Sequence, residues 1–198
     1  IKCRVDNIDW IGRTVYLGVD LSQTTDNTAV AMVALDDDRT TVLADVMAFI
    51  PEGRIDDKNR EEKLDYNQFV GDGQCIACGD RIIDYAVVEE YVFQLEKKYG
   101  CKIAYIGFDR ANAMSSAQKW DKDYTTVEIR QHSTVLHPAT KLLKEKILLL
   151  RTLKNLTYKH HLQSLNYVEE LKATLTSAFI SFPITTILQH FSFKNKRT

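Results

Sequence analysis

The 198-residue sequence contains few of the residues that interrupt or cross-link a chain: three prolines, eight glycines and four cysteines. So few cysteines exclude a small disulfide-stapled scaffold. Because no secretory signal opens the sequence, we expect reduced thiols. No apolar run is long enough to cross a bilayer, which argues against a membrane-spanning protein. The phosphate-binding pattern G-x-x-x-x-G-K-[ST] is also missing, so these residues are not expected to form a P-loop ATPase.

The 44% hydrophobic content is typical of a soluble domain that buries a sizeable core. Because the sequence opens with Ile1, we expect a piece of a longer chain. The net charge of −1 conceals an uneven distribution: residues 1–124 hold 15 Lys and Arg against 23 Asp and Glu, whereas residues 125–198 hold 11 against 4. No Asp follows Asp123 and no Gly follows Gly107. Such a break indicates a change of domain, of role or of reading frame.

Residues 14–20, 28–35 and 41–49 are rich in β-branched and apolar side chains, which predicts strands. Short polar turns separate these segments, so an antiparallel meander is expected. Pro51 ends this unit. Residues 53–79 are polar and charged with scattered apolar anchors, and we interpret them as an excursion over the surface.

From Ile83 to Tyr99, apolar residues recur three and four positions apart, which predicts a helix. Asp84 stands at its N-terminus and Gly100 at its C-terminal cap, positions that suit these residues. Further patterns predict strands at 103–109 and 125–129 and helices at 112–120 and 138–150. A meander followed by alternating helices and strands predicts an α/β fold with a mixed sheet flanked by helices.

Asp20 and Asp109 each end a predicted strand. Carboxylates on adjacent strands can converge, and a divalent cation between them would remove their mutual repulsion. Mg²⁺ and Mn²⁺ accept such ligands, and two ions roughly 4 Å apart can assist phosphodiester cleavage. The alternative is that each aspartate only ends a strand or begins a turn.

Several segments, in order, resemble the nuclease domain of tailed-phage terminase large subunits: residues 12–29, 82–85, 106–113, 130–131 and 137–144. The resemblance covers about residues 12–149. It implies a ribonuclease H-like fold, with Asp20 and Asp109 as the first and second metal-binding acids and two Mg²⁺ or Mn²⁺ ions as cofactors. Asp26, in the turn after the first acid, either assists the site or forms an Asx-turn.

The resemblance also implies a function, an endonuclease that cleaves concatemeric double-stranded DNA in the host bacterial cytoplasm, away from any membrane. The implied partners are a packaging ATPase domain, the terminase small subunit and the portal. We therefore interpret residues 1–149 as a terminase nuclease-like domain. Residues 150–198 are interpreted as a divergent or frameshifted tail, helical in part.

The family's third acid is expected on a C-terminal helix, where this sequence departs from the pattern. After Glu128 the carboxylates are Glu145, Glu169 and Glu170. Either Glu169 or Glu170 replaces the third acid, or both are exposed on a helix. We favour the second alternative and expect a chain that folds around residues 12–149 but cleaves DNA poorly or not at all.

Other candidate residues have simpler interpretations. Cys75 and Cys78 have metal-ligand spacing, but Cys3 and Cys101 are poorly placed to complete a zinc site, so half-buried thiols are expected. His160 and His161 are interpreted as solvated. The remaining candidates are Lys141, Lys144 and Lys146, as DNA contacts or a polar helix face, and Tyr105 and Trp120, as core residues.

Three alternatives to the leading function remain at this point. A Holliday-junction resolvase-like nuclease would share the fold. An actin-like or sugar-kinase fragment also opens with a strand, a Gly-x-Asp and a Thr-rich turn. That class of protein does not explain the Gly-Phe-Asp-Arg-Ala-Asn segment at residues 107–112. A catalytically incomplete prophage remnant would keep the fold without the chemistry.

Overall fold

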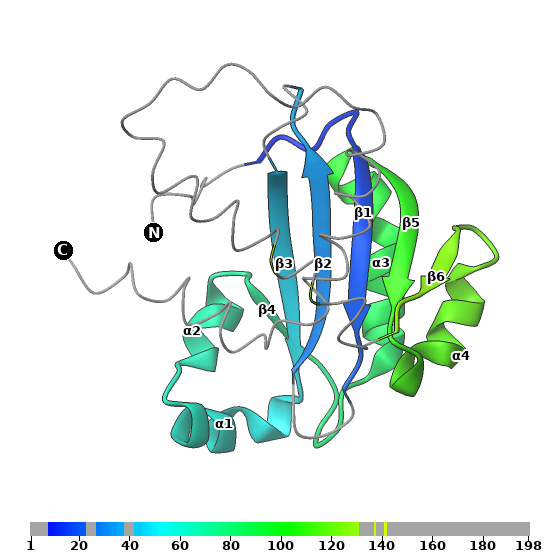
Figure 1. Ribbon diagram of the computed structural model, residues 1–198. Coiled ribbons are helices and arrows are strands. Elements are labelled where there is room, and N and C mark those ends of the chain that lie inside the picture. The colour runs from blue at the N-terminus through cyan, green and yellow to red at the C-terminus, as the bar shows by residue number, and fades with distance from the viewer. Residues whose placement is uncertain (1–7, 23–26, 38–41, 131–136, 138–140, 142–198) are drawn as a thin grey trace.

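The computed structural model describes residues 8–22, 27–37, 42–130, 137 and 141 (Figure 1). These residues form a six-stranded sheet of order β4-β3-β2-β1-β5-β6. The strands are β1 Thr14–Asp20, β2 Thr28–Leu35, β3 Val42–Ile50, β4 Cys75–Ala77, β5 Lys102–Phe108 and β6 Thr126–Glu128. The helices are the 3₁₀ helix η1 Glu52–Arg54 and the α-helices α1 Ile55–Glu62, α2 Tyr66–Gly71, α3 Tyr85–Tyr99 and α4 Arg110–Trp120.

The pairing of the strands is mixed. β1, β2 and β3 form an antiparallel meander, as their short polar turns predict. β1 pairs in parallel with β5, β5 with β6, and β3 with β4. The predicted α/β class is confirmed, because this is a mixed sheet with helices packed against it. The predicted bounds of the meander strands agree with the structure to within one residue.

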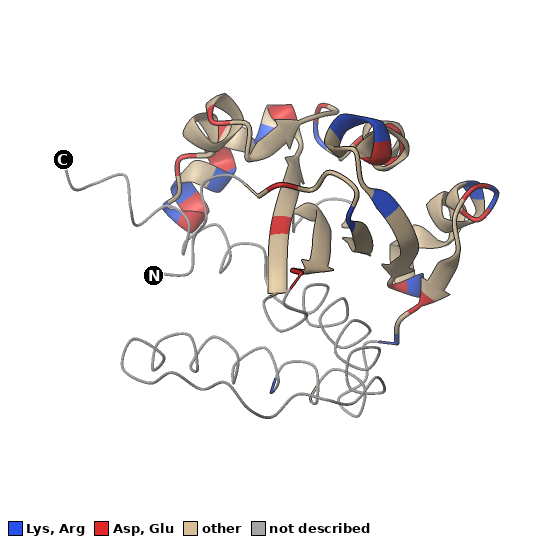
Figure 2. Ribbon diagram, turned by 90° about the horizontal axis from the view of Figure 1, so that it is seen from above, with Lys and Arg blue, Asp and Glu red and all other residues tan. Residues whose placement is uncertain are grey.

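The main hydrophobic core lies between α3, α4 and one face of the sheet. Val15, Leu17 and Val19 alternate along β1 and are fully buried in this core. Helix α3 contributes Val88, Val92 and Leu95 to the same core, which confirms the helical face predicted from their spacing. In Figure 1, α3 lies behind β1 and β5, and Figure 2 shows charged residues chiefly on the helices and turns.

The ends of α3 are capped as the sequence predicts. The Asp84 side chain accepts a hydrogen bond from the Ala86 amide, and Gly100 takes a left-handed conformation with φ +65°. The Gly100 carbonyl then accepts from the Gly12 amide at 2.8 Å. Helix α3 therefore runs back along the sheet, and its N-terminus lies at the end where β1 and β5 finish.

A buried charge joins α3 to α4. Glu89 is 7% exposed, and its carboxylate accepts from Ser116 Oγ at 2.7 Å and from Lys119 Nζ at 2.6 Å. Burying a carboxylate is unfavourable unless both of its oxygens find partners, and here each oxygen has one. This contact fixes α4 against α3 and so positions the N-terminus of α4.

The prediction that residues 53–79 are a surface excursion was wrong. They form η1, α1, α2 and the edge strand β4, and they build a second core on the opposite face of the sheet. Its buried residues are Ala29, Ala48, Ile50, Ile55, Tyr66, Phe69 and Cys75. These elements are too short to show periodicity: α1 buries only Ile55 and Lys58, and α2 buries only Tyr66 and Phe69.

The helix predicted at 138–150 and the tail at 150–198 lie outside the described residues. Trp120 is fully buried at the C-terminal end of α4, as expected of a core residue, and Tyr105 is half-buried. Among the described helices, none has the length and apolar character that crossing a membrane requires.

Gly79 and Gly73 provide a matched test of the loops that build the second core. Both have φ +71°, but a Cβ at Gly79 would lie 2.1 Å from the Ile82 carbonyl oxygen, whereas a Cβ at Gly73 would meet nothing within 4 Å. We expect Gly73→Ala to lower the free energy of unfolding by about 1 kcal/mol, through backbone strain alone. Gly79→Ala should lower it by about 3 kcal/mol or more. Urea unfolding measures both, and equal losses would contradict the described turn at Gly79.

Candidate functional site

The candidate site is built on the parallel register of β1 and β5. Gly18 pairs with Gly107, and Val19 pairs with Phe108. Asp20 and Asp109 each come one residue later, so they occupy equivalent positions where the two strands end. The prediction that these aspartates stand on adjacent parallel strands is confirmed.

Both aspartates belong to the sheet face that lies away from α3. Tyr16 and Tyr105, paired across the strands, contact each other edge-on with ring centroids 4.8 Å apart. Side chains alternate along a strand, so the positions two and four residues after each tyrosine share its face. Asp109 keeps an extended backbone, with φ −86° and ψ 136°, which continues the alternation. The intervening positions on this face are Gly18 and Gly107, and both are buried.

Asp109 occupies the N-cap position of α4 but does not act as a cap. Its side chain makes no hydrogen bond to the first turn of the helix. Among the described residues it also has no ion-pair partner, and it is half-buried. Asp20 is likewise half-buried. Asp109 therefore does not cap α4 through its side chain.

Asn112 and Tyr85 approach this end of the sheet from the two helices. Asn112 Nδ2 donates to the Leu21 carbonyl at 2.8 Å, which ties the first turn of α4 to the residue after Asp20. Tyr85 begins α3, and its hydroxyl is buried with no hydrogen-bond partner. Burial raises the pKa of Tyr85, and the negative charge of Asp20 raises it further. Tyr85 therefore stays protonated as a donor close to that carboxylate.

Sequence reasoning assigned no role to Asn112, Tyr85 or Asn27, the buried residue before β2. All three lie within the segments that resemble the terminase nuclease, so the resemblance was the sequence feature that could have identified them. What the sequence could not supply was the pairing of Asn112 with the carbonyl of Leu21, 91 residues away.

The remaining predicted residues do not extend the site within the described part of the chain. There, no group of three or more His, Cys, Asp or Glu side chains gathers to hold a metal. Lys141 is exposed. Seven predicted positions lie outside the described residues: Asp26, Lys144, Lys146, His160, His161, Glu169 and Glu170.

The Cys75 and Cys78 thiols are buried rather than half-buried, a correction to the sequence prediction. Burial raises the pKa of Cys75 to about 12, which disfavours the thiolate that zinc requires. Cys101 belongs to the main core, whereas Cys75 belongs to the second core on the other face of the sheet. Cys3 lies outside the described residues.

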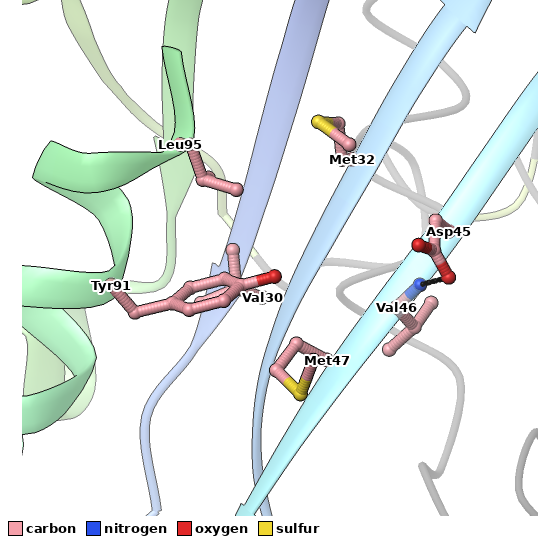
Figure 3. A pocket seen from close by; sticks show the side chains of 7 residues that line it. All are labelled: Val30, Met32, Asp45, Val46, Met47, Tyr91 and Leu95. Atoms are coloured by element: carbon pink, nitrogen blue, oxygen red, sulfur yellow. Dashed lines mark hydrogen bonds between the residues drawn. The ribbon is translucent and has the colours of Figure 1, made fainter. Parts of the chain in front are cut away.

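A small pocket lies on the opposite face from the aspartates (Figure 3). It is lined by Val30, Met32, Asp45, Val46, Met47, Tyr91 and Leu95. Val30 and Met32 belong to the main core, and they alternate with residues on the face that carries Asp20. This pocket is therefore separate from the candidate site.

A mixed sheet with flanking helices and paired carboxylates at the ends of adjacent parallel strands is the architecture of a ribonuclease H-like nuclease. Residues 1–149 match the family described as "Terminase large subunit, endonuclease domain". The chain belongs to that family, which decides against the resolvase and actin-like alternatives.

A solved structure, the "Crystal structure of the HK97 bacteriophage large terminase", resembles the chain with a TM-score of 0.62. The two sequences are 21% identical, so this likeness shows the fold. The match covers 71% of this chain and 29% of that one, so the chain spans under a third of the large terminase it resembles. No curated protein matches the sequence.

We expect Asn112→Ala to lower the free energy of unfolding by about 1 kcal/mol, because the Leu21 carbonyl loses its donor. It should also speed amide hydrogen exchange in the residues around Leu21. Gln118→Ala, on the exposed side of α4, is the control and should change stability by less than about 0.5 kcal/mol. Equal stability and exchange in the two variants would show that Asn112 does not hold α4 against β1.

Proposed function

We propose that this domain is a divalent-metal-dependent endonuclease that cleaves concatemeric double-stranded DNA during phage DNA packaging. Its membership of the terminase endonuclease family supports the class of reaction. The observation that supports the site is the register of β1 and β5: Val19 pairs with Phe108, and Asp20 and Asp109 are the next residues. The proposed site is therefore this pair of carboxylates.

The two aspartates suit Mg²⁺ or Mn²⁺. Both ions prefer hard oxygen ligands, and two neighbouring carboxylates repel one another unless a cation or a proton lies between them. Asp109 makes no capping bond that would compete with a cation. When bound, a pair of such ions would supply an activated water and stabilisation of the leaving oxygen.

The side chains of the domain would prepare the site for this chemistry. Asp20 and Asp109 would hold the positive charge at one point of the sheet edge. The protonated Tyr85 hydroxyl, near Asp20 and unpaired, is a donor that can orient that carboxylate or a water bound beside it.

A catalytically incomplete domain is the second candidate. The observation that favours it is that the described residues contain no group of three or more His, Cys, Asp or Glu side chains that could hold a metal. The third acid of the family would have to come from Glu169 or Glu170, which lie outside them. With two acids the second ion would be held mainly by water and by the DNA phosphate, so we keep the expectation of slow cleavage.

The partners and the location follow from the proposed role. A packaging ATPase domain would deliver the DNA, and the terminase small subunit and the portal would be the other partners in the host bacterial cytoplasm. These proposals rest on the family and not on a surface of this domain.

The test is nicking of supercoiled plasmid by the full 198-residue chain in Mn²⁺. We expect slow nicking that falls by about 100-fold in Asp20→Asn and in Asp109→Asn, since several kcal/mol of charge stabilisation is lost. Asp123→Asn changes an exposed carboxylate beyond the far end of α4 and should leave the rate unchanged. Nicking that persists in Asp20→Asn would reject the proposed site. Further loss in Glu169→Gln/Glu170→Gln would identify the tail as the source of the third acid.

A further inference from the structure

A chain of buried polar groups leads from α1 to the start of β2. Lys58 Nζ donates to Glu62 Oε1 at 2.9 Å, and the hydroxyl of Tyr66 donates to the other carboxylate oxygen, Oε2. Asn27 Nδ2 in turn donates to the Tyr66 hydroxyl oxygen at 2.7 Å. Lys58 is 1% exposed, Tyr66 is 0% exposed and Asn27 is 4% exposed.

The chemistry of these groups determines which partner donates in each of these hydrogen bonds. An ammonium group can only donate and an ionised carboxylate can only accept, so Glu62 receives both Lys58 and the Tyr66 proton. Burial, and the hydrogen bond to Glu62, raise the pKa of Tyr66, which keeps that proton in place. The Tyr66 oxygen must then accept, and Asn27 has to turn its NH₂ group toward it.

With the amide in this orientation, Tyr66 binds the Asn27 NH₂ group and not its carbonyl oxygen, Oδ1. Oδ1 is buried and has no hydrogen-bond partner among the described residues. A buried acceptor without a partner is unfavourable by about 1–3 kcal/mol, so its persistence calls for a ligand.

The topology places Asn27 beside the paired aspartates. Asp20 pairs with Ala29 across β1 and β2, and Asn27 precedes Ala29 by two residues. Diagonal neighbours of this kind have Cβ atoms roughly 7–8 Å apart and share a face of the sheet. Tyr66, which binds Nδ2, packs with Ala48 and Ile50 of β3. Because Tyr66 holds Nδ2, Oδ1 is the free branch of the amide, and β1, which carries Asp20, is the neighbour of β2 on the side opposite β3.

We infer that Asn27 Oδ1 is a third oxygen ligand of the cation site formed by Asp20 and Asp109, and that the Lys58–Glu62–Tyr66 chain orients its amide. This inference rests on the proposed function. A neutral amide oxygen is a hard donor of the kind that Mg²⁺ and Mn²⁺ accept, and it adds a ligand without adding repulsion. The hydrogen-bond chain is the outer support that sets the direction of the ligand.

The experiment is calorimetric titration of the full chain with Mn²⁺, in the absence of DNA. We expect Asn27→Ala to weaken binding by about tenfold, and Tyr66→Phe to weaken it about threefold, because the amide is then free to turn. Asn27→Asp, which is similar in size and adds a charge, should bind Mn²⁺ more tightly than wild type. Asp123→Asn changes an exposed carboxylate beyond the far end of α4 and should bind as wild type. Thermal unfolding without metal establishes which variants are folded.

The outcomes separate the inference from the proposed function. Loss of binding in Asp109→Asn, with wild-type affinity in both Asn27 variants, would overturn the inference and leave the nuclease site standing. A wild-type chain that does not bind Mn²⁺, or an Asp109→Asn variant that binds as well as wild type, would overturn both. If Asn27→Ala does not fold, Asn27→Asp decides: tighter binding supports the inference, and unchanged or weaker binding rejects it.

Discussion

The backbone hydrogen bonds between β1 and β5 hold these strands in parallel register from Tyr16 and Tyr105 to Val19 and Phe108. A slip of one residue would turn Asp109 to the other face of the sheet and separate it from Asp20. Burial opposes such a slip, because Val19 and Phe108 would have to leave the core that α3 and α4 cover. The contacts of Glu89 with α4, and of Asn112 with Leu21, strengthen the same register from outside the sheet.

The proposed site would bring two carboxylates together, which is unfavourable unless a cation or a proton lies between them. Sequences generally avoid like charges at adjacent positions of neighbouring strands, and exceptions are concentrated at functional sites. The surroundings of Asp20 and Asp109 are consistent with such a site. A donor hydroxyl from Tyr85 and an acceptor oxygen from Asn27 are both buried there without partners, and both would gain from an occupied cation site. These are two of the three buried side-chain atoms without a hydrogen-bond partner among the described residues; the third, Trp120 Nε1, lies in the main core.

The parts of the fold that the sequence predicted are those with long, regular patterns. The meander strands, α3 with its caps at Asp84 and Gly100, and the strand and helix around Asp109 all have enough residues to show a period. The elements within residues 53–79 are too short to show a period. Lys58 looks like a surface residue in the sequence, because only the structure shows that it is buried and paired with Glu62. The site was predicted only as far as the placement of Asp20 and Asp109 at strand ends, which can be read from the sequence, and their role there stays a prediction. Asn27 was not, since its role depends on Tyr66, which lies 39 residues away on another element.

The most direct measurement is anomalous diffraction from crystals of the full chain grown in Mn²⁺. An anomalous difference map locates manganese without any assumption about its ligands. The account predicts a peak between the carboxylates of Asp20 and Asp109, with Asn27 Oδ1 turned toward it, at ligand distances of about 2.0–2.2 Å. A map with no peak there, or with manganese bound only at other carboxylates, would contradict the central claim that the β1–β5 register builds a cation site.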